Sequence, residues 1–287
     1  IDSALALAAL TGGAFDPTVE PLTRAWDMRG KGRVPNEREL ADALARTGWT
    51  RIALDRGSQR VQLNGTQLDL GGIAKGFALD RAAGVLVSRG LRDATLDAGG
   101  QRLVLGSGTT VWVAMPAQRD VPAASVLLAG ASLSSSAQSE RFVSAGGRRY
   151  GHVLDPRTGR PVSTDAAVSV RAASATRADA LSTALLVLGR SRAQAFAAAH
   201  SDIGVLWLRA GTGLEPVDRG DGSRRGSRGQ GERHTGPDFH CRGICIARCF
   251  TTRGFRSRHC SEPSLTHHSR RTRPMRRWLP MLLLLAL

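Results

Sequence analysis

The sequence GHVLDPRTGRP, residues 151–161, places a histidine, an aspartate, two arginines, a threonine and two prolines within eleven residues. A purely structural hairpin does not need so many polar and turn-forming residues, and this density is typical of a functional loop. Proline fixes its own φ and biases the preceding residue away from the helical region, so Asp155-Pro156 predicts an exit from regular structure. Thr158-Gly159 then closes the predicted turn.

The residues just before this loop predict a β-hairpin. Residues 141–153, RFVSAGGRRYGHV, carry apolar and aromatic side chains around the glycine-rich turn Ala145-Gly146-Gly147. His152 is therefore expected at the end of a strand, close to Asp155, and the two side chains could face one site. The residues leave an alternative open, in which Asp155 caps an Asx-type turn and His152 is merely half buried.

The composition divides the chain near residue 218. Residues 219–287 hold fifteen arginines, no lysine and four acidic residues, which gives +11 of the formal net charge of +16. All four cysteines and five of the seven histidines lie there too. Residues 1–218 therefore fold without disulfides, and the charge of the whole chain does not mark them as a nucleic-acid-binding domain.

Residues 219–287 are predicted to be a disordered or out-of-frame arginine-rich tail. Their bias is typical of GC-rich DNA translated out of frame, and residues 275–287, MRRWLPMLLLLAL, resemble the start of a secretory signal peptide. Two functional alternatives have less support than a disordered or out-of-frame tail. In the first, the arginine- and glycine-rich part binds RNA. In the second, the tail holds a metal ion, although the spacing of the candidate ligands is not a standard zinc pattern. Those candidates are His240, Cys241, Cys245, Cys249 and Cys260.

Hydrophobic patterns and turn signals predict an α+β fold with a largely antiparallel or mixed sheet and packed helices, because the strands come in hairpins. The predicted helices are residues 2–10, 36–47, 77–88, 176–189 and 191–200. Residues 51–70 are predicted to form strands with a hairpin turn at Asn64-Gly65. The other predicted strands lie within residues 95–105, 110–115, 125–137, 166–172 and 202–209. Residues 14–26 are expected to be extended.

Two segments carry candidate ligand-binding groups. Residues 71–76, GGIAKG, lead into a predicted helix, and such a turn can hold an anion on its N–H groups, with Lys75 as a further charge. The turn fits neither the Walker pattern nor GxGxxG, and tight packing explains it at least as well. Asp179 and Thr183 are four residues apart on one helical face. Their hard oxygen atoms suit Mg²⁺, although a polar patch on a helix is the simpler explanation.

Five blocks, in the same order along the chain, resemble the FAD:protein FMN transferases of the ApbE family. They are TGGAFDPTVEPL (11–22), LDLGGIAKGFALD (68–80), LDAGGQ (96–101), RRYGHVLDPRTGRPV (148–162) and ADALSTALLVLG (178–189). The resemblance implies a T-fold-like architecture for residues 1–218. It also implies an Mg²⁺-dependent enzyme that transfers the FMN half of FAD, through a phosphoester, to a threonine of a target protein. Some members also hydrolyse FAD to FMN and AMP.

The resemblance also assigns roles to individual residues. It implies that Mg²⁺ is held by Asp179, Thr183 and the main-chain oxygen of Gly72, and that His152 is the general base, so that His152 and Asp179 are the catalytic residues. The implied contacts to the flavin nucleotide are Ala14, Phe15, Asp16, Asp69, Lys75 and the backbone around Val153. Cleavage of a pyrophosphate needs a cation on the phosphate oxygens and a group that accepts the proton of the attacking hydroxyl, and these assignments supply both.

The implied partners are FAD and a redox subunit with an acceptor threonine; nucleic acid is not expected. The resemblance implies the periplasmic face of the bacterial inner membrane. Family members carry a further N-terminal region, with an export or lipoprotein signal, before the TGGAFDP block. We therefore expect an N-terminally truncated domain, with membrane association only through that region. The alternative is a flavin-binding protein of the same fold that lacks turnover because this region is missing.

Overall fold

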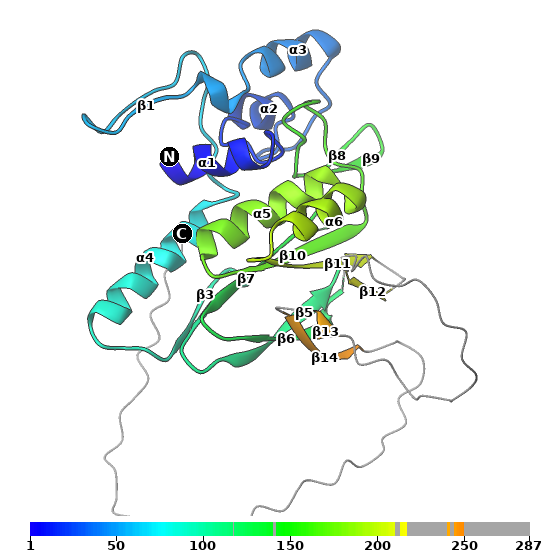
Figure 1. Cartoon of the computed structure of the whole chain (residues 1–287). Coiled ribbons are helices and arrows are strands. Elements are labelled where there is room, and N and C mark those ends of the chain that lie inside the picture. The colour runs from blue at the N-terminus through cyan, green and yellow to red at the C-terminus, as the bar shows by residue number, and fades with distance from the viewer. Residues whose placement is uncertain (117, 140–141, 210–212, 217–239, 242–243, 250–287) are drawn as a thin grey trace, which may run out of the picture. The chain divides into compact units, whose positions relative to one another are not determined.

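The computed structural model describes residues 1–116, 118–139, 142–209, 213–216, 240–241 and 244–249 of the chain, all within one compact unit, Ile1–Thr251 (Figure 1). Most of the predicted tail, residues 219–287, lies outside these residues, as does Cys260. The predictions for the tail and for the domain boundary at residue 218 therefore stay predictions. Within the described part of the chain, no helix is both long and apolar enough to cross a membrane.

A six-stranded sheet forms the centre of the fold, and every strand pair in it is antiparallel. The strand order is β12-β11-β10-β7-β4-β3. The bounds are β3 (Ala94–Ala98), β4 (Gln101–Leu105), β7 (Ala131–Ala137), β10 (Ala166–Ala172), β11 (Gly204–Arg209) and β12 (Gly213–Pro216). Together with the packed helices, this arrangement confirms the predicted α+β class.

Helices cover one face of this sheet (Figure 1). Helix α5 (Ala175–Leu188) packs on β7 and β10, with α4 (Ala74–Ser88), α6 (Arg190–Ala199) and α1 (Asp2–Leu10) against it. Buried residues occur all around α5, including Ala178, Leu181 and Leu185. The sheet on one side and three helices on the others leave α5 almost no face toward solvent.

The other face of the sheet packs against a second, antiparallel sheet. Strands β5 (Thr109–Met115) and β6 (Gln118–Leu128) form its hairpin, β14 (Ile244–Cys249) pairs with β6, and β13 (His240–Cys241) pairs with β14. A separate apolar core lies between the two sheets. Its largest members are Val104, Val111, Val126, Leu128, Leu133, Leu206 and Leu208.

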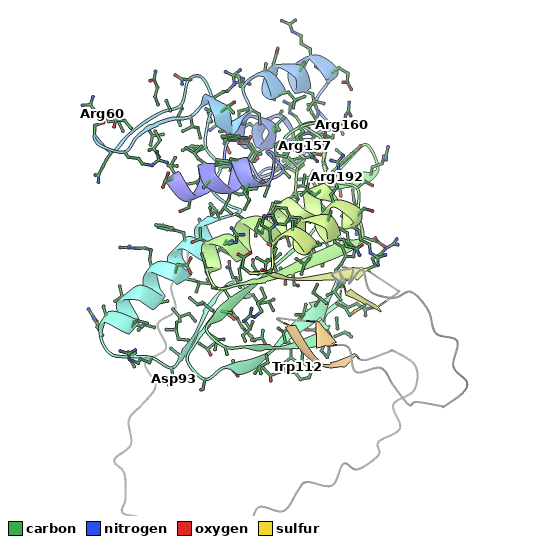
Figure 2. The ribbon with its side chains drawn as sticks, in the orientation of Figure 1. Arg60, Asp93, Trp112, Arg157, Arg160 and Arg192 are labelled. Carbon is green, nitrogen blue, oxygen red and sulfur yellow. The ribbon has the colours of Figure 1, made fainter. Side chains whose placement is uncertain are left out.

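Two N-terminal helices and one hairpin lie beside the GHVLDPRTGRP loop. Helices α2 (Glu20–Ala25) and α3 (Glu37–Ala45) pack together, and β8 (Phe142–Ala145) pairs with β9 (Arg148–Gly151) as predicted. Trp26 Nε1 donates a hydrogen bond of 2.8 Å to the Gly159 carbonyl oxygen. Arg160 pairs with Glu37 at 2.8 Å, and Figure 2 shows Arg160 beside these helices. These contacts attach the loop to the N-terminal helices.

Two predictions near the N-terminus are wrong. The segment expected to be extended contains α2, because Pro21 lies in the first turn of a helix, where a missing N–H costs nothing. The turn at Asn64-Gly65 forms, but it does not join the paired strands. The Asn64 side chain instead donates to the Arg51 carbonyl oxygen at 2.8 Å. The paired strands are β1 (Ala53–Asp55) and β2 (Arg60–Gln62), and η1 (Trp49–Arg51) precedes them.

Candidate active site at the contact of α4 and α5

Helices α4 and α5 approach each other closely at their N-terminal ends. Gly76 allows this approach, because a Cβ atom at this position would overlap the carbonyl of Ala175. Asp80 of α4 fastens the start of α5: its carboxylate accepts hydrogen bonds from Ser174 Oγ (2.7 Å), the Ala175 N–H (2.7 Å), and the N–H and hydroxyl of Thr176 (2.9 and 2.6 Å). A carboxylate at a helix N-terminus also interacts favourably with the helix dipole. The glycine-rich turn before α4 is thereby held beside the first turns of α5.

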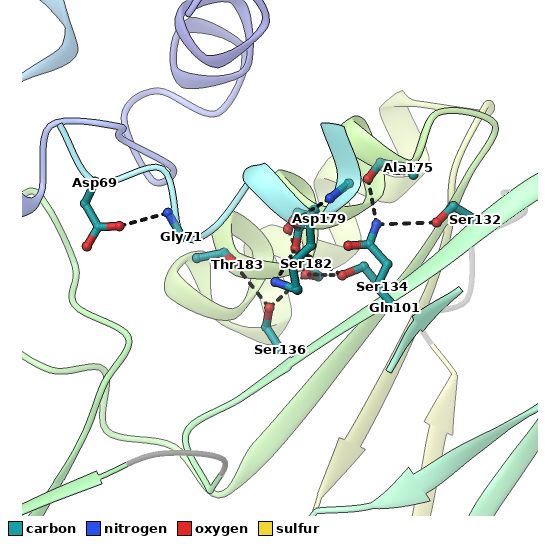
Figure 3. Close-up of polar contacts among 12 residues, drawn as sticks. Asp69, Gly71, Gln101, Ser132, Ser134, Ser136, Ala175, Asp179, Ser182 and Thr183 are labelled. Carbon is teal, nitrogen blue, oxygen red and sulfur yellow. Dashed lines mark hydrogen bonds and ion pairs between the residues drawn. The ribbon is translucent and has the colours of Figure 1, made fainter. Parts of the chain in front are cut away.

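Asp179 lies in this contact with a side chain that is only 3% exposed. Its Oδ2 accepts the Gly76 N–H at 3.0 Å, and its Oδ1 accepts Lys75 Nζ at 3.1 Å and Ser134 Oγ at 3.4 Å (Figure 3). A buried carboxylate is costly unless it is paired. Lys75 supplies the opposite charge. The predicted metal ligand Asp179 and the predicted nucleotide contact Lys75 thus form an ion pair with each other.

Thr183 lies one turn further along α5, and Gly72 lies next to it. A Cβ atom on Gly72 would be 3.4 Å from Thr183 Oγ1 and 3.4 Å from the Phe15 ring. The backbone of the glycine-rich turn therefore approaches the Thr183 hydroxyl with no side chain between them. The structure brings together the three predicted metal-ligating residues, Gly72, Asp179 and Thr183.

The donor set of this site is one carboxylate with neutral oxygen atoms. No group of three or more His, Cys, Asp or Glu side chains that could hold a metal ion occurs among the described residues. Zinc sites use three or four such ligands, whereas Mg²⁺ is commonly bound by one or two carboxylates, with water and substrate phosphates completing its shell. The residues present therefore fit Mg²⁺ bound together with a phosphate-bearing substrate.

Sequence reasoning missed the polar residues beneath α5. Ser134 and Ser136 of β7 contact Asp179 and Thr183, and Gln101 Nε2 donates to the Ala175 carbonyl oxygen at 2.8 Å and to Ser132 Oγ at 3.4 Å (Figure 3). The available signal was the segment ASLSSSA, where serine recurs at alternate positions of a predicted strand. That pattern marks one polar face, but it does not say what the face contacts.

The predicted flavin contacts near the N-terminus are buried. Ala14 and Phe15 belong to the same apolar core as Val153. Asp16 closes its own loop: one oxygen accepts the N–H and hydroxyl of Thr18 at 2.8 and 2.6 Å, and the other accepts the Trp49 N–H at 2.9 Å. Burial raises the pKa of Asp16 above its ordinary value, against these hydrogen bonds. The roles of these residues toward a flavin stay predictions.

Asp69 connects the glycine-rich turn to α2. It accepts the Gly71 N–H at 2.8 Å and pairs with Arg29 at 2.8 Å. Arg29 also pairs with Glu20 of α2 at 2.7 Å, and its hydrogen bond lowers the pKa of Glu20. Asp69 therefore shapes the turn next to Gly72, and its contact with the nucleotide stays a prediction.

His152 directly follows β9, as predicted, and is half buried. The neighbouring Val153 is held by Gln138, whose side chain accepts the Val153 N–H at 2.9 Å and donates to its carbonyl at 2.8 Å. Asp155 accepts the Arg157 N–H at 3.0 Å and pairs with the Arg157 guanidinium at 2.8 Å. The Asx-turn alternative is thus correct for Asp155, and the role of His152 stays a prediction.

A model of the ApbE family matches residues 1–207. The chain belongs to the ApbE family. A relative called FAD:protein FMN transferase from Treponema pallidum is 34% identical over 248 residues, which cover 76% of this chain and 68% of the relative. One from Rhodobacter capsulatus is 36% identical over 193 residues, covering 64% of this chain but only 36% of the relative. The crystal structure of an ApbE protein from Thermotoga maritima has a TM-score of 0.69 and 35% identity, covering 75% of this chain and 73% of that one.

The five ApbE-like blocks meet around α5. Phe15, Ile73 and Val153, from the first, second and fourth blocks, share one apolar core with Leu181 and Leu185 of the fifth. The third block joins through the hydrogen bond from Gln101 to the Ala175 carbonyl. The segments that carry the ApbE resemblance are thus far apart in sequence but adjacent in space.

Proposed function

We propose that this chain is an Mg²⁺-dependent FAD:protein FMN transferase that acts on a threonine hydroxyl of a target protein. The observation that carries the proposal is the meeting of Asp179, Thr183 and Gly72 where the glycine-rich turn contacts α5. The names of the relatives support the flavin substrate and the protein acceptor. Mg²⁺ and threonine are proposed from the donor set and from the family resemblance.

In the proposed reaction, the threonine oxygen attacks the phosphorus of the FMN half of FAD. The bond from that phosphorus to the bridging oxygen breaks, AMP leaves with the bridging oxygen, and the threonine carries FMN as a phosphoester. Water in place of threonine would give FMN and AMP. The hydroxyl proton must be removed, and His152 is proposed as its acceptor because histidine ordinarily titrates near neutrality.

The Asp179 carboxylate, the Thr183 hydroxyl and the Gly72 main-chain oxygen would hold Mg²⁺. When bound, Mg²⁺ supplies positive charge to the phosphate oxygens, where negative charge develops as the pyrophosphate is cleaved. The N-terminus of the 15-residue helix α4, directly after the glycine-rich turn, adds a favourable field for the same anion.

Lys75 is proposed to bind the pyrophosphate. Its side chain is 45% exposed and reaches Asp179 from the first turn of α4. A flexible, exposed ammonium group can exchange a carboxylate partner for a phosphate when a metal ion takes over that carboxylate. The proposed acceptor protein, a redox subunit at the periplasmic face of the inner membrane, rests on the family resemblance alone.

The test is flavin transfer to a threonine-bearing acceptor peptide, followed by in-gel flavin fluorescence. We compare Asp179→Asn, which removes the charge and keeps the shape, with Asp42→Asn, which changes an exposed carboxylate on α3. Asp179→Asn should lower transfer by about 10²-fold or more, by analogy with the loss of one preorganised electrostatic contact. Asp42→Asn should leave it unchanged, and EDTA should abolish transfer in the unsubstituted chain.

Two results would contradict the proposal. Transfer that survives both EDTA and Asp179→Asn would exclude the metal site. Tight FAD binding with neither FMN-peptide nor AMP formed would favour the alternative of a flavin-binding protein without turnover.

A further inference from the structure

Strand β7 presents a row of hydroxyl groups to α5. Side chains of a strand alternate between its two faces, and Ser132, Ser134 and Ser136 lie on the face toward the helices. Leu133, between them in sequence, belongs to the apolar core on the other face. Polar groups beneath a buried helix are costly unless they are hydrogen-bonded, so the partners of these serines indicate why they are there.

Two of these serines contact the proposed metal ligands. Ser134 Oγ donates to Asp179 Oδ1 at 3.4 Å, and Ser136 Oγ lies 3.2 Å from Thr183 Oγ1 (Figure 3). Ser136 Oγ also lies 2.8 Å from Ser182 Oγ. Ser182 Oγ in turn lies 2.8 Å from the main-chain oxygen of Asp179. Three hydroxyl groups thus form a chain that ends on a carbonyl.

The carbonyl end sets the direction of every hydrogen bond in this chain. A carbonyl only accepts, and the Asp179 main-chain oxygen, at 2.8 Å, is much nearer to Ser182 Oγ than the competing acceptor Ser134 Oγ, at 3.4 Å. Ser182 therefore donates its single proton to the Asp179 oxygen. At the next contact Ser182 must accept, so Ser136 donates to it. Ser136 has then used its own proton, and Thr183 must be the donor at the last contact. The Thr183 proton therefore points into the sheet.

We propose that Ser136 is a positioning residue that turns the Thr183 hydroxyl so that its oxygen lone pairs are available to the divalent cation. A hydroxyl that ligates a cation must offer a lone pair and place its proton elsewhere, and groups behind the ligands of a metal site commonly perform this orientation. Were Ser136 to donate instead, its proton would occupy a Thr183 lone pair. This inference rests on the proposed function, because it requires the cation site.

The test is a titration with Mn²⁺, in the absence of flavin, that measures the free ion by electron paramagnetic resonance. Ser136→Ala removes the acceptor for the Thr183 proton and should weaken Mn²⁺ binding by about 10-fold or more, the usual effect of such a group. Ser182→Ala leaves Ser136 without its acceptor and free to donate to Thr183, so binding should weaken here too. Ser135→Ala is the matched control, since Ser135 is the adjacent residue of β7 and contacts Ser169 on β10 at 2.6 Å.

A double-mutant cycle separates orientation from a general structural role. If Ser136 acts through Thr183, Ser136→Ala should cause no further loss of Mn²⁺ affinity once Thr183 is alanine. Unchanged affinity in both Ser136→Ala and Ser182→Ala, or full additivity with Thr183→Ala, would overturn the inference and leave the metal site intact. Failure of the unsubstituted chain to bind Mn²⁺ more tightly than Asp179→Asn would instead overturn the proposed metal site, and this inference with it.

Discussion

At the scale of single residues, the buried carboxylate of Asp179 determines how the site is built. Its charge lies between α4 and α5, with the Gly76 N–H, Lys75 and Ser134 as partners. Lys75 is the only one of these that carries a full positive charge, and it is also the most exposed. The chain therefore neutralises Asp179 with a cation that can be displaced.

Replacing Lys75 with methionine should make stability depend more strongly on a divalent cation. Without metal, Asp179 loses its ion pair, and the free energy of unfolding should fall by about 1–2 kcal/mol, a typical value for a hydrogen bond to a charged group with one exposed partner. Added Mg²⁺ binds only the folded site and no longer competes with the ammonium group, so it should raise the Tm more than in the unsubstituted chain.

The measurement is the Tm in EDTA and in excess MgCl2, with Lys31→Met, which changes an exposed lysine remote in sequence from the site, as the control. An Mg²⁺-dependent rise in Tm that is equal in Lys75→Met and in the unsubstituted chain would show that Lys75 and the cation do not share Asp179.

The carboxylate and hydroxyl of the proposed metal site are predictable from residue spacing, whereas the residues that support them are not. Asp179 and Thr183 are four apart in a helical segment, which places both on one face. Ser136 gives no such signal, because a strand pattern identifies a polar face without identifying the helix that covers it. For Asp16 the sequence motif predicts a ligand contact, but in the structure its oxygens accept hydrogen bonds from the N–H groups of Thr18 and Trp49. A motif alone does not distinguish a residue that closes a loop from one that binds a ligand.

At the scale of elements, the contact between α4 and α5 sets the geometry of the site. Asp80 caps α5, Gly76 permits the close approach, and the glycine-rich turn is carried to Thr183 as a result. The sequence predicts both helices but not the contact between them. That contact depends on Gly76 and Asp80 of α4, and neither residue stands out in a helical sequence pattern.

Replacing Gly76 with alanine should separate these helices. The new methyl group would overlap the Ala175 carbonyl, which is backbone and cannot rotate away, so overpacking of about 1–3 kcal/mol is expected together with weaker Mn²⁺ binding. Gly84→Ala on the same helix meets open space and should be neutral or stabilising, by up to about 1 kcal/mol, through helix propensity. Denaturant unfolding of the two variants makes the comparison; equal effects would refute the packing argument.

The attachment of α2 to the glycine-rich turn should make stability depend on pH. The hydrogen bond from Arg29 lowers the pKa of Glu20, so the folded chain binds fewer protons than the unfolded chain between the two pKa values. This stabilisation is complete above the ordinary pKa of 4.5 and is lost as the pH falls through the lowered value.

Glu20→Gln tests this attachment. At neutral pH the substitution should cost about 1–2 kcal/mol, because the Glu20 side chain is only 7% exposed and its charged hydrogen bond with Arg29 is lost, although Arg29 keeps its ion pair with Asp69. The difference from the unsubstituted chain should shrink as the pH is lowered through this range. Glu37→Gln, in an ion pair whose carboxylate is 83% exposed, should change stability by less than about 0.5 kcal/mol. A Glu20→Gln effect that does not vary with pH would contradict the assignment.

At the scale of the whole molecule, five separate segments build one site around α5. The residues of these segments and their order along the chain were enough to predict the family. The α+β class was predicted separately, from strands that come in hairpins. The prediction did not extend to the second sheet, whose apolar face toward β7, β10 and β11 becomes evident only when the strands are paired. Local periodicity identifies strands, but it does not say which sheet each one joins.

Transfer of FMN from FAD to a threonine is tested best by the stoichiometry of the two products, AMP and FMN-peptide. Purified chain, FAD, Mg²⁺ and an acceptor peptide are incubated, AMP is quantified by chromatography and the peptide by mass spectrometry, with a valine-for-threonine peptide as the control. We expect AMP and FMN-peptide in equal amounts, with no FMN-peptide from the valine version. AMP and free FMN without labelled peptide would show a hydrolase, and the absence of AMP would exclude both transfer and hydrolysis of FAD.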